Sequence, residues 1–193
     1  MLLCCHIKYD PDLLVRVMAL SLPERRKKAQ GIRDEKTRAA SLSAGLLLKY
    51  GLQQCGVLDV DICYTEKGKP YLAGNDLYFS LSHSGEYAAC VIDKKVIGVD
   101  IQKIVAVSQR AVSRFCTEEE LQYLNNSHDY YRDVIRLWAL KESWLKATGK
   151  SAADMFNASF TLRADGTVDG PEGFEYRLYE RIPDYILAVC QSK

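Results

Sequence analysis

The chain has 193 residues, of which 48% are hydrophobic and 26% charged, a balance typical of a globular protein with one substantial core or two smaller linked cores. A formal net charge of +1 gives no general argument for nucleic acid binding, and no apolar run approaches the ~18 residues that cross a bilayer. The N-terminus also lacks the apolar core of a signal peptide, so the sequence favours a cytoplasmic protein without a membrane partner.

Seven cysteines are scattered along the chain without a CxxC pair. Several lie in apolar, strand-like segments, which favours buried thiols in a reducing compartment over a disulfide framework or a zinc site. A catalytic cysteine is not indicated, because none is flanked by groups that activate a thiol.

Two consecutive helices are predicted near the N-terminus. Ser21 before Pro23 predicts a capped helix to about Ala29, and a second helix is predicted from Asp34 to Tyr50, ending at Gly51. A local excess of basic residues falls in this region. Such a surface suits a small polyanion, although a solvated helix face explains the same composition. The basic residues are Arg16, Arg25, Arg26, Lys27, Lys28, Arg33, Lys36, Arg38 and Lys49.

Strand-like segments follow in the middle of the chain. They begin at Val60 with VDICY, turn at residues 67–70, and continue as DLYFSLSHS, YAACVID and VIGVDIQ. This order predicts a meander.

The last of these strands carries polar side chains on one face. Alternation places Gly98, Asp100 and Gln102 on the same side of the strand. A buried, unpaired carboxylate is costly, so Asp100 needs a partner, and a cation with oxygen ligands is one solution. An Asp bonded to backbone N–H groups at a strand end is the alternative, and this segment alone does not choose between them.

Two helices are predicted in the C-terminal half. Thr117 followed by Glu120 has the form of a capping box and opens a helix to about Leu124. A longer helix is predicted from about residue 130 to residue 148, closed by Gly149. Strands with Asp-Gly turns are predicted in FNASFTLRADGTVDG, FEYRLYE and DYILAVCQ. The order of helices, strands, helices and strands predicts an α+β protein, with each half one α+β unit.

The longer helix places charged side chains at the border of an apolar sector. Glu142 and Lys146 fall on this border, beside Trp138. Glu and Lys four residues apart often form only a solvated pair worth about 0.3–0.5 kcal/mol. A carboxylate at such a border, however, faces a cleft as easily as it faces water. The apolar sector consists of Val134, Leu137, Trp138, Trp144 and Leu145.

Four segments in this order, KGKPY, FSLSHSGEYAAC, IGVDIQ and RLWALKESWLKATGK, make the chain resemble a 4′-phosphopantetheinyl transferase of the long, surfactin-synthetase-activating type. The G-V-D and W-x-x-K-E-S-x-x-K motifs are its most specific elements. The resemblance implies transfer of phosphopantetheine from coenzyme A to a serine of an acyl or peptidyl carrier protein, with Mg²⁺ on the pyrophosphate and release of adenosine 3′,5′-bisphosphate. It also implies a monomer with two similar α/β subdomains, residues 1–97 and 98–193, related by a pseudo-twofold axis with the active site between them.

The resemblance assigns a metal site and a catalytic pair. Asp100, Gln102 and Glu142 would be the Mg²⁺ ligands, Glu142 would accept the proton of the incoming serine, and Lys146 would contact the reacting phosphate of coenzyme A. Many relatives carry an acid in place of Gln102, so the resemblance implies one negative charge less and weaker Mg²⁺ affinity here.

The resemblance also assigns contacts with coenzyme A. Lys69 would line the nucleotide pocket, and His83 would approach the phosphates, with a structural histidine as the alternative. Lys141 and Trp138 would support the motif, and Lys141 is also a candidate coenzyme A ligand. The remaining candidate ligands are Arg25, Arg26, Lys28, Arg38 and Ser82.

Carrier docking is predicted in residues 103–124, where apolar side chains alternate with Arg110 and Arg114. A core-packed loop and helix is the alternative for the aliphatic residues. A non-catalytic module that binds coenzyme A or a carrier protein is the alternative function, and retention of Asp100, Glu142 and Lys146 argues against it. The sequence has no Walker loop or GxGxxG motif for another class of nucleotide enzyme, and nucleic acid is not a predicted partner.

Overall fold

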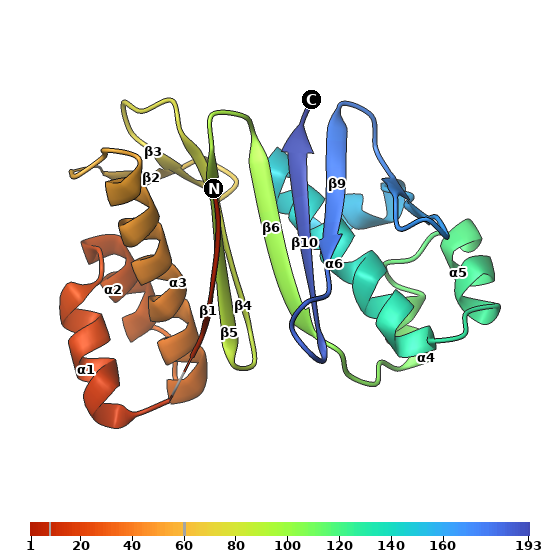
Figure 1. The fold of residues 1–193 in the computed structure, drawn as a ribbon, viewed down its shortest axis with the longest axis horizontal. Coiled ribbons are helices and arrows are strands. Elements are labelled where there is room, and N and C mark those ends of the chain that lie inside the picture. Colours follow the sequence, from red (N-terminus) through yellow and green to blue (C-terminus); the bar gives the residue numbers. More distant parts are fainter. Residues whose placement is uncertain (8, 60) are drawn as a thin grey trace. The chain divides into compact units, whose positions relative to one another are not determined.

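The computed structural model describes residues 1–7, 9–59 and 61–193 in two compact units, unit 1 (Met1–Lys94) and unit 2 (Lys95–Lys193) (Figure 1). Each unit packs one long helix on a three-stranded antiparallel sheet. The predicted α+β class with two similar units is therefore confirmed. No helix in the described part of the chain is both long and apolar enough to span a membrane.

Unit 1 is built on the helix α3 (Glu35–Gln54), which packs against the sheet β1-β5-β4. Leu48 and Leu52 of this helix meet Phe79 and Ile92 of the sheet in a common core. The predicted strand VDICY is present in part, as one strand of a separate two-stranded ribbon. Its first residue, Val60, lies outside the described residues. The strands are β1 (Leu2–His6), β2 (Ile62–Tyr64), β3 (Pro70–Leu72), β4 (Tyr78–Ser84) and β5 (Tyr87–Asp93).

Two shorter helices precede α3, and the first was not predicted. The carboxylate of Asp10 caps α1 (Pro11–Leu20) by accepting the N–H of Asp12 at 2.9 Å. Ser21 does not cap α2 (Pro23–Gln30) as expected, because its hydroxyl donates to the carbonyl of Val17 at 2.6 Å and so closes α1.

The helix α3 continues through Gly51, where its end was predicted. A Cβ at Gly51 would lie 2.5 Å from Cδ1 of Ile92. This glycine therefore serves the close approach of α3 to β5, and the gain in packing offsets the propensity cost of a glycine inside a helix.

Unit 2 is built on the helix α6 (Tyr130–Thr148), which packs against the sheet β6-β10-β9. The predicted meander is wrong at both ends, because β2 pairs with β3 in a separate sheet and β6 pairs with the distant β10, with Asp100 opposite Ala188. The strands are β6 (Ile97–Lys103), β7 (Thr161–Leu162), β8 (Val168–Asp169), β9 (Phe174–Tyr179) and β10 (Tyr185–Ser192).

The helices of unit 2 begin and end where local signals predict. Thr117 forms both bonds of the capping box of α5 (Glu118–Asn125), and Gly149 closes α6 in the left-handed conformation, with φ of 68°. Two short elements, α4 (Gln109–Val112) and the 3₁₀ helix η1 (Ala152–Asn157), complete the unit.

All seven cysteines are free thiols, but not all are buried. Cys90, Cys116 and Cys190 lie in the interior, whereas Cys4 and Cys55 are exposed. Burial raises the pKa of Cys90 to about 12, so this thiol stays protonated and unreactive at neutral pH.

Candidate active site

The backbone of α6 lies close against that of β6 at Gly98. A Cβ there would lie 2.6 Å from the backbone nitrogen of Ala147 and would also clash with the carbonyl of Ser143. Only glycine permits this contact. It brings the turn of α6 that carries Glu142 and Lys146 onto the strand that carries Asp100.

Asp100 is the centre of the polar contacts on this face of β6. Its side chain is only 2% exposed, its Oδ1 accepts a bond from Nζ of Lys146 at 2.6 Å, and its Oδ2 accepts one from Nε2 of Gln102 at 2.9 Å. The partner that a buried carboxylate requires is therefore a lysine from α6, together with the amide two residues along the strand.

Glu142 lies one turn before Lys146 and is half-buried. Burial raises the pKa of Glu142, the negative charge of Asp100 raises it further, and Lys146 lowers it in part. The carboxylates of Asp100 and Glu142 thus repel each other, and the ammonium group of Lys146 compensates this repulsion in part. A divalent cation would relieve this repulsion.

The side chains present fit a magnesium ion. Asp100 and Glu142 offer carboxylate oxygens and Gln102 offers an amide oxygen, and Mg²⁺ prefers such hard ligands. No group of three or more His, Cys, Asp or Glu side chains in the described residues is arranged to hold a metal. A cation at this place would instead be held by two carboxylates, those of Asp100 and Glu142, and by the amide oxygen of Gln102.

Lys141 does not face the same side of α6 as Glu142. Its side chain is 0% exposed, pairs with Glu120 at 2.8 Å and donates to the carbonyls of Met155 and Ala158. The expected contact of Lys141 with coenzyme A does not fit this geometry, whereas its expected support of the motif does. Sequence reasoning missed Glu120 as its partner, because the capping box already accounted for that residue.

The predicted coenzyme A ligands other than Lys141 and Lys146 belong to unit 1. Arg26 and Lys28 are exposed on α2, and Arg38 donates twice to the carbonyl of Ile32, at 3.0 and 2.7 Å. The polar pair of β4, Ser82 and His83, is buried and half-buried, and Lys69 is half-buried before β3.

Arg25, in contrast, is an interior residue of unit 1. It is 7% exposed, and its Nη2 donates to the carbonyl and hydroxyl of Ser41 at 2.8 and 2.9 Å. Burial lowers the pKa of Arg25, and its Nε finds no hydrogen-bond partner among the residues described. A direct contact of Arg25 with a phosphate does not fit this placement, because α2 and α3 enclose the side chain.

The segment predicted to dock a carrier protein is divided between core and surface. Phe115 is 4% exposed and stacks edge-on against Trp138, with ring centroids 4.9 Å apart. Ile104 and Val107 also pack on the core of unit 2, so the core-packed alternative holds for these three residues. The side chains that remain available to a partner include Val105, Arg110 and Arg114.

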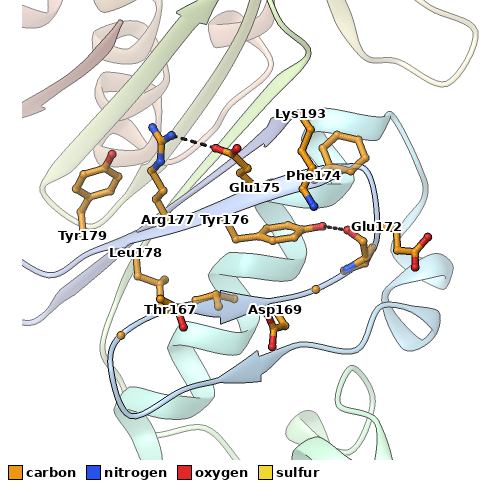
Figure 2. Close-up of a pocket in the computed structure, with 14 residues that line it drawn as sticks. Thr167, Asp169, Glu172, Phe174, Glu175, Tyr176, Arg177, Leu178, Tyr179 and Lys193 are labelled. Carbon is orange, nitrogen blue, oxygen red and sulfur yellow. Dashed lines mark hydrogen bonds and ion pairs between the residues drawn. The ribbon is translucent and has the colours of Figure 1, made fainter.

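A hollow of about 630 Å³ lies elsewhere in unit 2, between β8 and β9 (Figure 2). Its charged side chains are largely compensated: Arg177 pairs with Glu175 at 3.2 Å, and Arg163 beside it pairs with Asp169. The hydroxyl of Tyr176 is bonded to the carbonyl of Pro171 at 2.9 Å. None of the predicted site residues lines this hollow, so its size does not identify it as the site of the chemistry.

Comparison with known proteins finds relatives that match most of the chain. The sequence profile of the "4'-phosphopantetheinyl transferase superfamily" matches residues 96–190. A Bacillus subtilis protein named 4′-phosphopantetheinyl transferase is 32% identical, over 92% of this chain and 84% of the relative. The 4′-phosphopantetheinyl transferase Sfp of Bacillus subtilis strain 168 is 29% identical over the same shares. A solved holo-[acyl-carrier-protein] synthase from Neisseria meningitidis matches half of this chain and 96% of its own, with 21% identity and a TM-score of 0.43.

Proposed function

The chain belongs to the 4′-phosphopantetheinyl transferase superfamily, and from this premise we propose that it transfers 4′-phosphopantetheine from coenzyme A to a serine of an apo acyl or peptidyl carrier protein. The observation that carries the proposal is the cluster of Asp100, Glu142 and Lys146 on facing sides of β6 and α6. The proposed chemistry needs two carboxylates and one ammonium group, and these three side chains supply them at the positions of the two motifs.

The proposed reaction exchanges one bond to phosphorus for another. The serine Oγ forms a bond to the phosphorus that carries pantetheine, and the bond from this phosphorus to the bridging pyrophosphate oxygen breaks. The bridging oxygen leaves on adenosine 3′,5′-bisphosphate. The serine proton passes to Glu142, directly or through one water, and the ammonium of Lys146 stabilises the charge on the reacting phosphate.

Glu142 suits the role of proton acceptor because its environment raises its pKa. Burial and the charge of Asp100 raise the pKa of Glu142 and so make its carboxylate a stronger base than an ordinary glutamate, while Lys146 opposes part of this rise. Asp100, Glu142 and Gln102 would hold Mg²⁺, which when bound supplies positive charge to the pyrophosphate.

The proposal assigns coenzyme A recognition to seven of the nine predicted ligands, six of which lie in unit 1. It leaves out Arg25, which donates a hydrogen bond to buried Ser41, and Lys141, which forms an ion pair with buried Glu120. We also propose that the protein works in the cytoplasm as a monomer, since one chain contains two units of the same kind. The proposed ligands of coenzyme A are Arg26, Lys28, Arg38, Lys69, Ser82, His83 and Lys146.

The test is incubation with coenzyme A, Mg²⁺ and a panel of apo carrier proteins, followed by intact mass measurement. We expect a phosphopantetheine adduct on the carrier serine that is lost with EDTA. Asp100→Ala and Glu142→Gln should each abolish the adduct, because the first removes a metal ligand and the second can no longer take the proton. Glu172→Gln, which changes an exposed carboxylate of the same unit, is the matched control and should retain full activity.

The alternative of a non-catalytic module predicts another pattern. Wild-type protein would then leave every carrier unmodified, yet bind coenzyme A or a carrier with an affinity that survives Glu142→Gln. Full transfer by the Glu142→Gln protein would contradict the proposed mechanism while leaving the family assignment in place.

A further inference from the structure

A fully buried ion pair lies on the side of α6 away from the candidate active site. Nζ of Lys141 and Oε2 of Glu120 are 2.8 Å apart, with side-chain exposures of 0% and 1%. Lys141 also donates to the carbonyl of Met155 at 3.1 Å and to that of Ala158. The lysine thus makes three bonds to the interior, the number that its ammonium group can donate.

The carboxylate of Glu120 is equally well bonded. It accepts the backbone N–H of Thr117 at 2.8 Å and that of Phe160 at 2.9 Å, in addition to Lys141. The pair therefore joins the start of α5, the middle of α6 and the chain that leaves η1 towards β7. The bond from Phe160 to Glu120 spans 40 residues of the chain, and the pair adds a buried polar connection to the apolar core that these segments share.

We infer that Lys141 and Glu120 are positioning residues, which fix the rotation of α6 about its own axis and so hold the Glu142 carboxylate beside Asp100. This inference rests on the proposed function. Successive residues of a helix point 100° apart, so a lysine bonded on one side dictates where its neighbour Glu142 points. The close contact at Gly98 fixes the distance of α6 from β6, and the buried pair fixes its rotation.

A small rotation would matter for catalysis. A glutamate carboxylate extends to about 6 Å from the helix axis, so a turn of about 10° displaces it by roughly 1 Å. Displacements of that size cost on the order of 100-fold in rate when a reacting group must be held in line. The metal ligand and proton acceptor would move together, because both roles belong to Glu142.

If Lys141 and Glu120 served stability alone, replacing both with uncharged residues would affect catalysis no more than it affects stability. Removing one partner of a buried ion pair costs about 3–5 kcal/mol, whereas replacing both partners with neutral groups is often close to neutral for stability. The double variant Lys141→Met with Glu120→Gln therefore separates positioning from stability, since the glutamine retains an oxygen that can accept a backbone N–H. Glu172→Gln, which changes an exposed carboxylate of the same unit, is the matched control.

We expect Lys141→Met alone to lower both the melting temperature and kcat. Adding Glu120→Gln should restore most of the melting temperature while kcat stays about 10-fold to 100-fold below wild type. KM for coenzyme A should change less than about threefold, because Lys146 is the one proposed ligand on α6 and the other six belong to unit 1. Calorimetric titration with Mg²⁺ alone should show weaker binding to the double variant, and Glu172→Gln should match wild type in every measurement.

Recovery of kcat and Mg²⁺ affinity together with the melting temperature would overturn the inference, since the pair would then be structural only. If the double variant does not fold, the single variant Glu120→Gln tests the inference instead. An Mg²⁺ affinity equal to that of wild type in this single variant would also overturn the inference. If wild type transfers nothing to any carrier, the proposed function fails, while the Mg²⁺ titration still tests the positioning of Glu142.

Discussion

Gln102 is the residue that distinguishes this site from a site of three carboxylates. Its Nε2 donates to Asp100 at 2.9 Å, and Lys146 takes the other oxygen of the same carboxylate at 2.6 Å. A glutamate in this position could not donate such a bond and would place a third negative charge beside Asp100 and Glu142. The amide thus holds Asp100 in place and lowers the total charge available to a cation.

Gln102→Glu should therefore bind Mg²⁺ more tightly than wild type. We expect about a tenfold lower dissociation constant, because a third carboxylate adds attraction for the cation, and a lower Mg²⁺ concentration for half-maximal transfer. Calorimetric titration with Mg²⁺ measures the first and the carrier assay the second. Gln53→Glu, on the exposed side of α3, controls for the added charge. An unchanged Mg²⁺ requirement would show that this side chain does not contact the metal site.

At the scale of elements, the contact between α6 and β6 brings the two halves of the site together. The neighbours that a Cβ at Gly98 would meet are backbone atoms, which cannot rotate away as a flexible side chain can. The position of the helix over the strand is therefore fixed by the absence of a single methyl group.

Gly98→Ala should separate α6 from β6 and impair both stability and transfer. Overpacking of this kind costs about 1–3 kcal/mol or more, and the displaced Glu142 and Lys146 should lower kcat at least tenfold. Thermal unfolding and the carrier assay measure the two effects. Gly31→Ala is the control, since its added Cβ would be 3.6 Å from the carbonyl oxygen of Lys28, an ordinary contact distance, and its φ of −77° suits alanine. Normal activity in Gly98→Ala would mean that the helix tolerates a shift.

A second contact of α6, made near its start, depends on charge. Arg136 bonds both oxygens of Glu180, at 2.6 and 2.9 Å, and Arg132 adds a bond to the same carboxylate at 2.9 Å. Burial alone would raise the pKa of Glu180, but the two arginines outweigh it and lower the pKa. A carboxylate with a lowered pKa stabilises the fold above its unfolded pKa of about 4.3, and this stability is lost as the pH falls through the folded value.

Glu180→Gln should therefore be less stable than wild type at pH 7, by up to about 1 kcal/mol, and the difference should shrink below about pH 4. Melting temperatures across this pH range measure it. Glu175→Gln, which alters a pair exposed by 53% and 58%, should change little at any pH. A difference for Glu180→Gln that grows as the pH falls would contradict the assigned role of the arginines.

At the scale of the whole molecule, the net charge of +1 conceals local surfaces of one sign. The segment from Lys103 to Phe115 exposes Val105, Arg110 and Arg114, while Ile104 and Val107 are partly buried against the core and Phe115 is buried. A small apolar residue flanked by arginines suits an acidic carrier helix through charge more than through buried area.

Reversing charge with Arg110→Glu and Arg114→Glu together should raise KM for the carrier about tenfold and leave KM for coenzyme A unchanged. The effect should diminish as salt is added, because exposed charges are screened. Arg163→Glu with Arg181→Glu, two exposed arginines of the same unit, is the control. Equal changes in KM for both substrates would show that the segment is not a carrier surface.

The sequence by itself determined the elements that local chemistry specifies. The capping box at Thr117, the closure of α6 at Gly149 and the strand β5 are as predicted, because caps, glycine turns and alternation act within a few residues. The order of the motifs was enough to indicate the family. Ser21 and Gly51 were misread because their signals are local but their roles are not: one closes the preceding helix, and the other faces Ile92 across a helix–sheet contact.

Only the tertiary structure decided which charged residues face outward. Within one motif, Glu142 and Lys146 meet Asp100 on β6, whereas Lys141 is bonded in the interior to Glu120. Arg25 and its neighbour Arg26 differ in the same way, one enclosed and one exposed. The physical reason is that the fate of a charged side chain depends on partners tens of residues away, and a sequence pattern does not contain the distances to them.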